Sequence, residues 1–277
     1  MPSTHRIASS VGGTPVNAYL VEGKRDVVVV DGTLTVSGGR AVRQRVIDTG
    51  KRLSAVVLTH SHPDHYGGIV EVVAGSDVPI IAAAGVDEVI RRDDSLKEGI
   101  LRPMFGDEWP RERAFPTERA HDGAELTFGD IELELRDLGP GESHHDTIWL
   151  LDGGATVFSG DQAYNHMHCY LADGHWNEWL ENIESLAADL RPDAVLHVGH
   201  GEPARLDLLA WQRGYIERFV EAVRSADWSD EDRAKADVAA AMGTYLPSED
   251  LRFLMELSIE PVATGLGVWS SDVRPGV

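Results

Sequence analysis

Cysteine is nearly absent from this sequence, which contains Cys169 alone among 277 residues. A single cysteine excludes an internal disulfide, so the fold must depend on a packed core, and we expect this thiol to be buried as a small apolar side chain. The sequence also lacks an apolar run near the roughly 20 residues of a membrane-spanning helix, and its N-terminus lacks the apolar stretch of a signal peptide. These absences predict a cytoplasmic protein that does not enter a membrane.

Basic residues are scarce relative to acidic ones. The sequence has 25 Lys and Arg against 46 Asp and Glu, which gives a formal net charge of -21. A surface of this sign repels a phosphate backbone, so we exclude nucleic acid as a partner and expect a small-molecule substrate. The length fits one large α/β domain with an appended unit better than two independent domains.

Apolar runs of strand length alternate with helical patterns over the first two thirds of the sequence. Residues 27–30 and 54–58 are apolar, β-branched runs typical of buried strands, and residues 39–50 between them have the apolar spacing of a helix. From residue 176 onward helical spacing dominates, in segments 176–190 and 204–240. Such alternation is typical of a layered α/β fold.

Residues 91–119 interrupt this alternation with scattered charges and three prolines. We interpret the segment as an insertion near the mouth of the functional site, since loops of this length often carry function. Met104, Phe105 and Trp109 would then form an apolar wall. The segment also carries basic residues that would suit an anionic substrate such as a glutathione thioester, namely Arg91, Arg92, Arg102, Arg111 and Arg113.

Three imidazoles and a carboxylate follow the strand at residues 54–58 within six positions, a composition typical of a metal site. His60 and His62 are two positions apart, so in extended backbone they point to the same side and can chelate one ion. Asp64 and His65 come after a proline that can open a helix, so their side chains can turn toward a second ion.

Further candidate ligands follow other apolar strands. The cluster Glu142-Ser143-His144-His145-Asp146 comes after a Gly-Pro-Gly turn, Asp161 follows Phe158-Ser159-Gly160, and His200 lies in Val198-Gly199-His200-Gly201. Functional residues collect at one edge of such sheets, so we expect these side chains to meet the first cluster.

In these motifs the sequence resembles the metallo-β-lactamase fold superfamily, whose HxHxDH motif is matched by His60, His62, Asp64 and His65. The resemblance covers about residues 14–203 and implies an α/β fold of the four-layer αββα sandwich type, with a dinuclear metal site at one edge of two sheets. We predict a catalytic domain over residues 1–205 and a C-terminal helical extension over residues 206–277 that packs on it.

The resemblance also implies the ligand sets. Asp161 looks like the family's bridging aspartate and His200 like its last histidine, so Asp64, His65, Asp161 and His200 would hold the second ion. His60, His62 and Asp161 would hold the first, together with Glu142, which follows the Gly-Pro-Gly turn where the family places a histidine. Two zinc ions are expected.

Glu142 stands where the family has that histidine. Three interpretations remain open: Glu142 itself binds the ion, His144 or His145 turns in to restore an imidazole, or the first site is weak or empty. A carboxylate is a harder ligand than imidazole, so a Glu142 ligand would shift the preference from zinc toward manganese or iron.

The resemblance predicts a hydrolase in which a metal-bound hydroxide attacks an ester, thioester, lactone or amide of a small molecule. Asp64 or Asp161 would orient the nucleophile. An iron-dependent oxygenase or oxidoreductase on the same fold is the alternative, and a non-catalytic metal-binding module is a third, because fold alone does not choose among them.

Residues flanking the motifs are candidates for substrate binding. Aromatic residues of the C-terminal helices would also allow pairing into a homodimer. The substrate-binding candidates are Tyr66, Tyr164, His166, His168 and Trp109.

Overall fold

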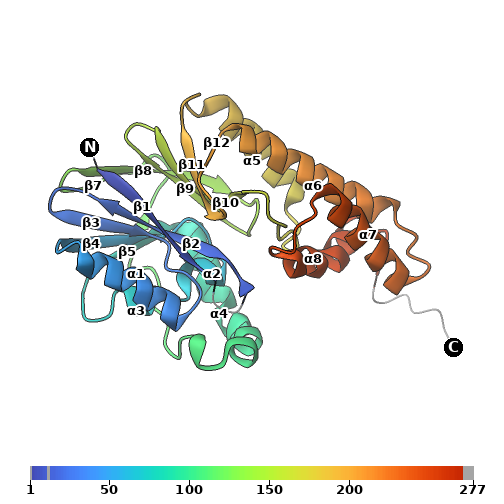
Figure 1. Cartoon of the computed structure of the whole chain (residues 1–277), viewed down its shortest axis with the longest axis horizontal. Coiled ribbons are helices and arrows are strands. Elements are labelled where there is room, and N and C mark those ends of the chain that lie inside the picture. Colours follow the sequence, from blue (N-terminus) through green and yellow to red (C-terminus); the bar gives the residue numbers. More distant parts are fainter. Residues whose placement is uncertain (1, 11–12, 271–277) are drawn as a thin grey trace.

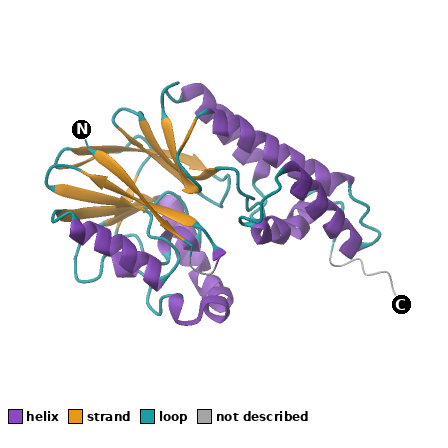
Figure 2. Cartoon of the chain, viewed as in Figure 1, coloured by secondary structure: helices purple, strands orange, loops and turns teal. Residues whose placement is uncertain are grey.

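The structure is a computed structural model that describes residues 2–10 and 13–270. Two six-stranded sheets lie at its centre, and helices cover their outer faces (Figure 1). Colouring by secondary structure shows the same four layers, with further helices at the C-terminal end (Figure 2). The predicted four-layer αββα fold is therefore confirmed.

The first sheet is built from the N-terminal part of the chain, and its strand order follows the sequence order. Its first three strands are antiparallel and the remaining ones add in parallel. The strands are β1 (Ser3–Ser9), β2 (Val16–Glu22), β3 (Asp26–Val30), β4 (Arg52–Val57), β5 (Ile80–Ala83) and β6 (Glu118–Ala120).

The second sheet is built from the following stretch of chain, and here too neighbours in sequence are neighbours in the sheet. Every pairing is antiparallel except the parallel pair β10 and β11. The strands are β7 (Glu125–Phe128), β8 (Ile131–Gly139), β9 (Asp146–Leu151), β10 (Thr156–Tyr164), β11 (Val195–His200) and β12 (Ala204–Arg205).

The outer layers consist of helices that contact one sheet each. Helices α1 and α4 contact strands of the first sheet, whereas α5 and α6 contact β10 of the second (Figure 1). The helices are α1 (Val36–Asp48), α2 (Pro63–Tyr66), α3 (Ile69–Val72), α4 (Ala84–Phe105), the 3-10 turn η2 (Gly106–Glu108), α5 (Trp176–Asp189), α6 (Asp207–Ser225), α7 (Glu231–Tyr245) and α8 (Arg252–Gly265). Among the described residues, no helix combines the length and apolar character needed to cross a bilayer.

The main core lies between the sheets and beneath α1. All five residues of β3 are buried, as expected for a central strand covered on both faces. Tyr19 of β2 packs against Phe158 of β10 with ring centroids 5.6 Å apart, and the Tyr19 hydroxyl donates to the Val198 carbonyl of β11. These contacts fix one sheet against the other and so fix the strand ends that carry the candidate ligands.

The predicted insertion at residues 91–119 begins within a helix, because α4 continues through Phe105. Ion pairs one turn apart stabilise this helix: Arg91 lies 2.7 Å from the buried Asp87, and Arg102 lies 2.9 Å from Glu98. The assignment of the segment as an insertion stays a prediction.

The predicted single helix over residues 204–240 is also wrong. Helix α6 ends at Ser225, and α7 begins after Asp230, whose side chain accepts from the Arg233 backbone N–H as an N-cap. Helices α6, α7 and α8 pack together on the second sheet's outer side. The division at residue 205 stays a prediction, and residues 271–277 of the predicted extension lie outside the described residues.

Candidate metal centre

The HxHxDH residues lie where β4 gives way to α2. His60 and His62 occupy the extended stretch after the strand, and Pro63 opens the short helix that carries Asp64 and His65. His60 forms an isolated bridge with Asp146 at the start of β9, which ties this loop to the second sheet. As predicted from the spacing of the motif, two of its side chains come from extended backbone and two from a helical turn.

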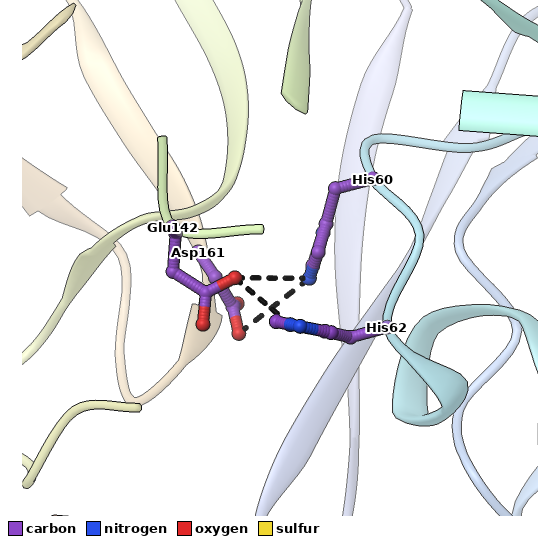
Figure 3. A group of neighbouring side chains, drawn as sticks. All are labelled: His60, His62, Glu142 and Asp161. Atoms are coloured by element: carbon purple, nitrogen blue, oxygen red, sulfur yellow. Dashed lines mark ion pairs between the residues drawn. The ribbon is translucent and has the colours of Figure 1, made fainter. Parts of the chain in front are cut away.

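A first group of ligand atoms meets at the gap between the sheets. His62 Nδ1 lies 2.9 Å from Glu142 Oε2, and His60 Nε2 lies 3.6 Å from the same oxygen. Asp161 Oδ2 lies 3.8 Å from His60 Nε2. Figure 3 shows these side chains converging on one point from the two sides of the gap. Two imidazoles and two carboxylates with one ligand atom each can hold one cation.

A second group lies beside the first. His200 Nε2 lies 3.0 Å from Asp161 Oδ2 and 3.3 Å from Asp64 Oδ2. His65 Nε2 lies 3.4 Å from Asp161 Oδ1. Asp161 belongs to both groups, with one oxygen facing the first group and both facing the second. This is the position that a bridging carboxylate needs.

Several atoms of these groups are buried without a hydrogen-bond partner, although buried polar atoms in proteins are almost always paired. They are His60 Nε2, His65 Nε2, Glu142 Oε2, Asp161 Oδ1 and His200 Nε2. All of them face the shared centre as nitrogen or oxygen donors. The residues present therefore fit bound metal ions, which would satisfy these atoms. We call the two groups together the cavity floor.

The structure distinguishes among the candidates after the Gly-Pro-Gly turn. Glu142 is buried and turns into the first group. His144 Nδ1 instead lies 2.8 Å from His175 Nε2, and His145 Nε2 lies 2.8 Å from Asp137 Oδ1. Both histidines thus have partners outside the floor, and the carboxylate occupies the third position.

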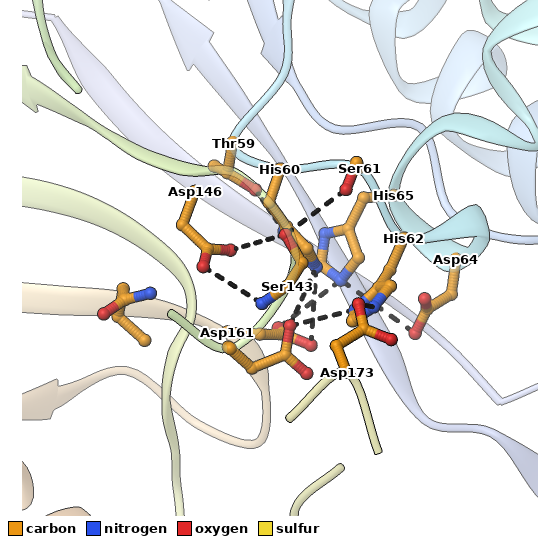
Figure 4. A network of polar contacts seen from close by, with 12 residues as sticks. Thr59, His60, Ser61, His62, Asp64, His65, Ser143, Asp146, Asp161 and Asp173 are labelled. Atoms are coloured by element: carbon orange, nitrogen blue, oxygen red, sulfur yellow. Dashed lines mark hydrogen bonds and ion pairs between the residues drawn. The ribbon is translucent and has the colours of Figure 1, made fainter. Parts of the chain in front are cut away.

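Polar residues behind the floor fix the orientation of the imidazoles. Asp31 accepts from the Thr59 hydroxyl at 2.9 Å and lies 2.8 Å from His65 Nδ1, which leaves His65 Nε2 facing the centre. His62 Nε2 lies 3.1 Å from Asp173 (Figure 4). The other ring nitrogen, Nδ1, is therefore the one that faces Glu142. Such outer partners set the tautomer and the direction of a metal-binding histidine.

Tyr164 connects the two carboxylates of the first group. Its hydroxyl lies 2.7 Å from Glu142 Oε1 and 2.9 Å from Asp161 Oδ2. Burial, and then the negative charges of Asp161 and Glu142, raise the pKa of Tyr164 well above its ordinary value, so it remains a proton donor. A hydroxyl donates one proton at a time, so Tyr164 can hold either carboxylate in place.

Burial and neighbouring charges have opposite effects on the pKa values of the floor residues. Burial raises the pKa of Glu142 to about 8, despite the opposing charge of His62. Burial lowers the pKa of His200, but the negative charges of Asp161 and Asp64 outweigh it and raise the value to about 10. In the described structure the carboxylates of the floor form their ion pairs with histidines only. Added positive charge would stabilise such a cluster.

Two glycines allow the sheets to approach this closely. A Cβ at Gly199 would lie 1.8 Å from Asp161 Oδ1 and 2.7 Å from His65 Cε1. Gly160 has φ of +50°, and a Cβ there would lie 2.6 Å from the Thr59 hydroxyl oxygen. Side chains at either position would push the ligands apart.

A cavity of about 410 Å³ opens onto the floor and includes His62, Asp64, Asp161 and Tyr164 in its lining. Its outer walls are apolar and come from two helices far apart in sequence, α4 and α8. We call these wall residues the cavity rim: Ile100, Met104, Phe105, Phe253 and Leu257.

Only part of the predicted substrate-binding set lies at this cavity. Tyr164 lines it, as do Met104 and Phe105 of the predicted apolar wall. Trp109 and Tyr66 are buried elsewhere, with the Trp109 indole donating to Glu98 and the Tyr66 hydroxyl donating to Asp94. Their polar atoms are used within the α4 region, so the prediction that they bind substrate is not supported.

The two histidines of that set also lie away from the lining. His168 is buried, with Nδ1 lying 2.8 Å from the Tyr215 hydroxyl and Nε2 3.0 Å from the Ser248 carbonyl oxygen. His166 is exposed, and its ring packs against Trp211 with centroids 4.6 Å apart. Both anchor the segment after β10 to the C-terminal helices.

Sequence reasoning missed Asp173 and the rim residues of α8. Asp173 lies in a loop without a motif, and only its contact with His62 reveals its role. Phe253 and Leu257 are spaced one helical turn apart, a pattern that a residue in a helix core shows equally well. Their exposure was the missing signal, and it requires the fold.

Comparison with known proteins relates the whole arrangement to one family. The model of the family described as "Metallo-beta-lactamase superfamily" matches residues 11–200. The Bacillus subtilis protein named "Uncharacterized protein YobT" is 42% identical over 227 residues, which cover 76% of this chain and 91% of that protein.

Other relatives bear the name "Hydroxyacylglutathione hydrolase". The protein from Cupriavidus taiwanensis is 26% identical over 205 residues, or 67% of this chain and 67% of its own length. The protein from Alkalilimnicola ehrlichii is 39% identical over 153 residues, or 55% of this chain and 49% of its own length. The chain thus spans about half to two thirds of the length of these two relatives.

Solved structures agree on the fold. A beta-lactamase domain protein from Burkholderia ambifaria has a TM-score of 0.69 at 18% identity, covering 95% of this chain and 85% of that chain. A metallo-beta-lactamase from Pontibacter korlensis has a TM-score of 0.61 at 18% identity, covering 77% of this chain and 94% of that chain. With the family model matching most of its length, the chain belongs to the metallo-beta-lactamase superfamily.

Proposed function

We propose that the protein is a hydrolase with two metal ions on the cavity floor, acting on an ester, thioester, lactone or amide of a small molecule. One observation carries this proposal: buried nitrogen and oxygen atoms that lack a hydrogen-bond partner converge at the base of an open cavity. Hydrolase names among the relatives support the same class.

Bound ions would supply an activated water at neutral pH and would polarise the oxygen of the scissile group. The chain's own residues hold this centre in place. Asp161 spans the two groups, while Asp31 and Asp173 fix the ring orientation of His65 and His62. Tyr164 keeps the Glu142 and Asp161 carboxylates in position through its hydroxyl.

Zinc is the proposed metal, since imidazole and carboxylate ligands both suit it. Glu142 in the place of an imidazole is the one observation that favours a harder ion, manganese or iron. With iron, the oxygenase or oxidoreductase alternative becomes the function to test. A cytoplasmic location and pairing into a homodimer stay predictions from the sequence.

Metal analysis of the full-length protein, together with assays on ester, thioester, lactone and amide panels, tests this function. We expect two ions per chain and hydrolysis that chelation abolishes and zinc restores. His60→Ala should lose metal and activity, whereas His121→Ala, at an exposed turn, should keep both. Iron with oxygen consumption would point to the oxidoreductase instead, and a protein that binds no metal would overturn the proposal.

A further inference from the structure

The cavity combines a charged floor with apolar walls. Ile100, Met104 and Phe105 of α4 face Phe253 and Leu257 of α8 across the opening. Cavities that bind small molecules are mostly apolar, with a few polar groups that fix the reacting end. Here the polar groups lie at one end and the apolar side chains at the other.

Apolar side chains of the rim are also exposed to an unusual degree. Met104 is 61% exposed and Leu257 is 59% exposed. Five of the seven large apolar side chains that are exposed in the described part of the chain lie on α4 and α8. The five are Leu96, Ile100, Met104, Phe253 and Leu257. Four of the five, all but Leu96, line the cavity, and exposed apolar area concentrated at one opening marks a binding surface.

Positive charge at the opening is low, although α4 and the segment after it are rich in arginine. Arg102 pairs with Glu98, Arg113 with Asp94, and Arg91 with Asp87, each at 3.0 Å or less. Lys97 is the basic residue that the described cavity lining contains. An anionic carrier such as glutathione would therefore meet one cation and a wall of hydrocarbon.

We infer that the substrate carries an uncharged alkyl chain, which binds between α4 and α8 while its ester, thioester, lactone or amide group lies over the cavity floor. This inference rests on the proposed hydrolase function. The continuity of the rim with His62, Asp64 and Asp161 in one cavity places the chain and the reacting group in the same molecule. Burial of the chain would then add directly to binding.

A chain-length series measures this effect on the full-length, metal-loaded enzyme. With p-nitrophenyl esters from acetate to decanoate, each added methylene should raise kcat/KM about fourfold until the cavity is filled, because each buried methylene contributes about 0.8 kcal/mol. A glutathione thioester should be a poorer substrate than an alkyl thioester of the same acyl group. A flat series, or preference for the glutathione thioester, would overturn the inference.

Substitutions at the rim assign the effect to these side chains. The double variant Met104→Gln, Leu257→Gln changes exposed residues, so it should fold, and we expect it to lose most of the rise in kcat/KM from the acetate to the decanoate ester. Ile47→Gln is the matched control, since Ile47 is 56% exposed on α1. If the control and the double variant show the same dependence of kcat/KM on ester chain length, the rim does not bind the alkyl chain.

Two further measurements distinguish failure of this inference from failure of the proposed function. Calorimetry of 1-butanol and 1-octanol binding to the metal-free protein tests the rim without catalysis. Octanol binding that is tighter than butanol binding and is lost in the double variant supports the inference, and equal affinity for the two alcohols opposes it.

Light scattering tests whether a second copy of the chain covers the rim instead. If the wild type is a dimer, the double variant is a monomer and the dependence of kcat/KM on ester chain length is the same in both, the rim is a subunit interface and the inference is overturned. Loss of all ester hydrolysis with octanol binding intact would instead contradict the proposed function.

Discussion

The floor and the rim of the cavity differ in almost every physical respect. The floor consists of buried, charged side chains from strand ends and short turns, held by further buried polar residues. The rim consists of apolar side chains on the surfaces of two helices, all exposed except the half-buried Phe105. Buried charges tolerate little change because each depends on its partners, whereas exposed apolar residues can be exchanged at small cost to stability. Reaction and selectivity are thus assigned to regions that can vary independently.

Loss of the Asp161 carboxylate, which the two ligand groups share, should have the largest effect of any change in the floor or the rim. Asp161→Ala removes an oxygen from both ligand groups, so we expect loss of both ions and a fall in activity larger than the 10- to 100-fold typical of outer partners of a metal ligand. Metal stoichiometry and kcat/KM measure the effect. Asp77→Ala, in the exposed turn before β5, is the control and should retain both. A variant that retains two ions would show that Asp161 does not bridge.

Exchange at Glu142 sharpens the question of which ion the floor prefers. Glu142→Gln should weaken the first site, because the carboxylate oxygen that faces His60 and His62 loses its charge. Glu142→His should keep that site and shift its preference toward zinc over manganese, since imidazole is the softer ligand. Competition between the two metals measures the shift. Equal preference in the wild type and Glu142→His would mean that residue 142 does not bind the ion.

A methyl group added in the close packing behind the floor should also disturb metal binding more than one added in the open space beside the rim. Gly199→Ala would press a methyl group against Asp161 and His65, so we expect a 10- to 100-fold loss of metal affinity, which a chelator competition measures. Gly99→Ala is its counterpart in α4, where an added Cβ meets nothing within 4 Å. There we expect a gain of about 0.5 to 1 kcal/mol in stability and unchanged metal binding. Identical behaviour of the two variants would contradict the contrast.

His145 lies outside the floor, and its substitution should give the smallest effect. Its hydrogen bond to Asp137 raises the pKa of His145 and lowers that of Asp137. The pair's contribution is therefore present between the ordinary pKa values of the two groups, about 4 to 6.5, and is lost as pH rises through the His145 pKa or falls through the Asp137 pKa.

We accordingly expect His145→Gln to lower the free energy of unfolding by up to about 1 kcal/mol near pH 5.5 and by much less at pH 9. Denaturant unfolding at the two pH values measures this difference. Metal content should not change, and a variant that loses metal would place His145 among the ligands.

Most of the floor could be predicted from the sequence because its signals are local. Residues 60–65 place their ligands by the geometry of a strand end and one helical turn, and Asp161 and His200 each follow an apolar run. The choice among Glu142, His144 and His145 could not be made, since neighbouring loop residues point in directions that only the folded turn determines.

Only the α4 side of the rim could be predicted in part. Met104 and Phe105 stood out as apolar residues among the charges of a segment expected near the mouth of the site, and both line the cavity. The α8 side could not be predicted. Helix α8 is separated from α4 in sequence by β6, the whole second sheet and three helices, α5, α6 and α7. No local pattern links two helices that meet only across an opening.

The order of strands in the two sheets has a consequence for how the protein assembles. Each sheet is made from an unbroken stretch of chain, so each can form through pairings close in sequence, which are kinetically the cheapest. The ligands, however, are divided between the stretches: His60, His62, Asp64 and His65 follow a strand of the first sheet, whereas Glu142, Asp161 and His200 belong to the second. A metal ion on the floor could therefore reach its full set of ligands only after the two halves have docked, and it would then link the two sheets.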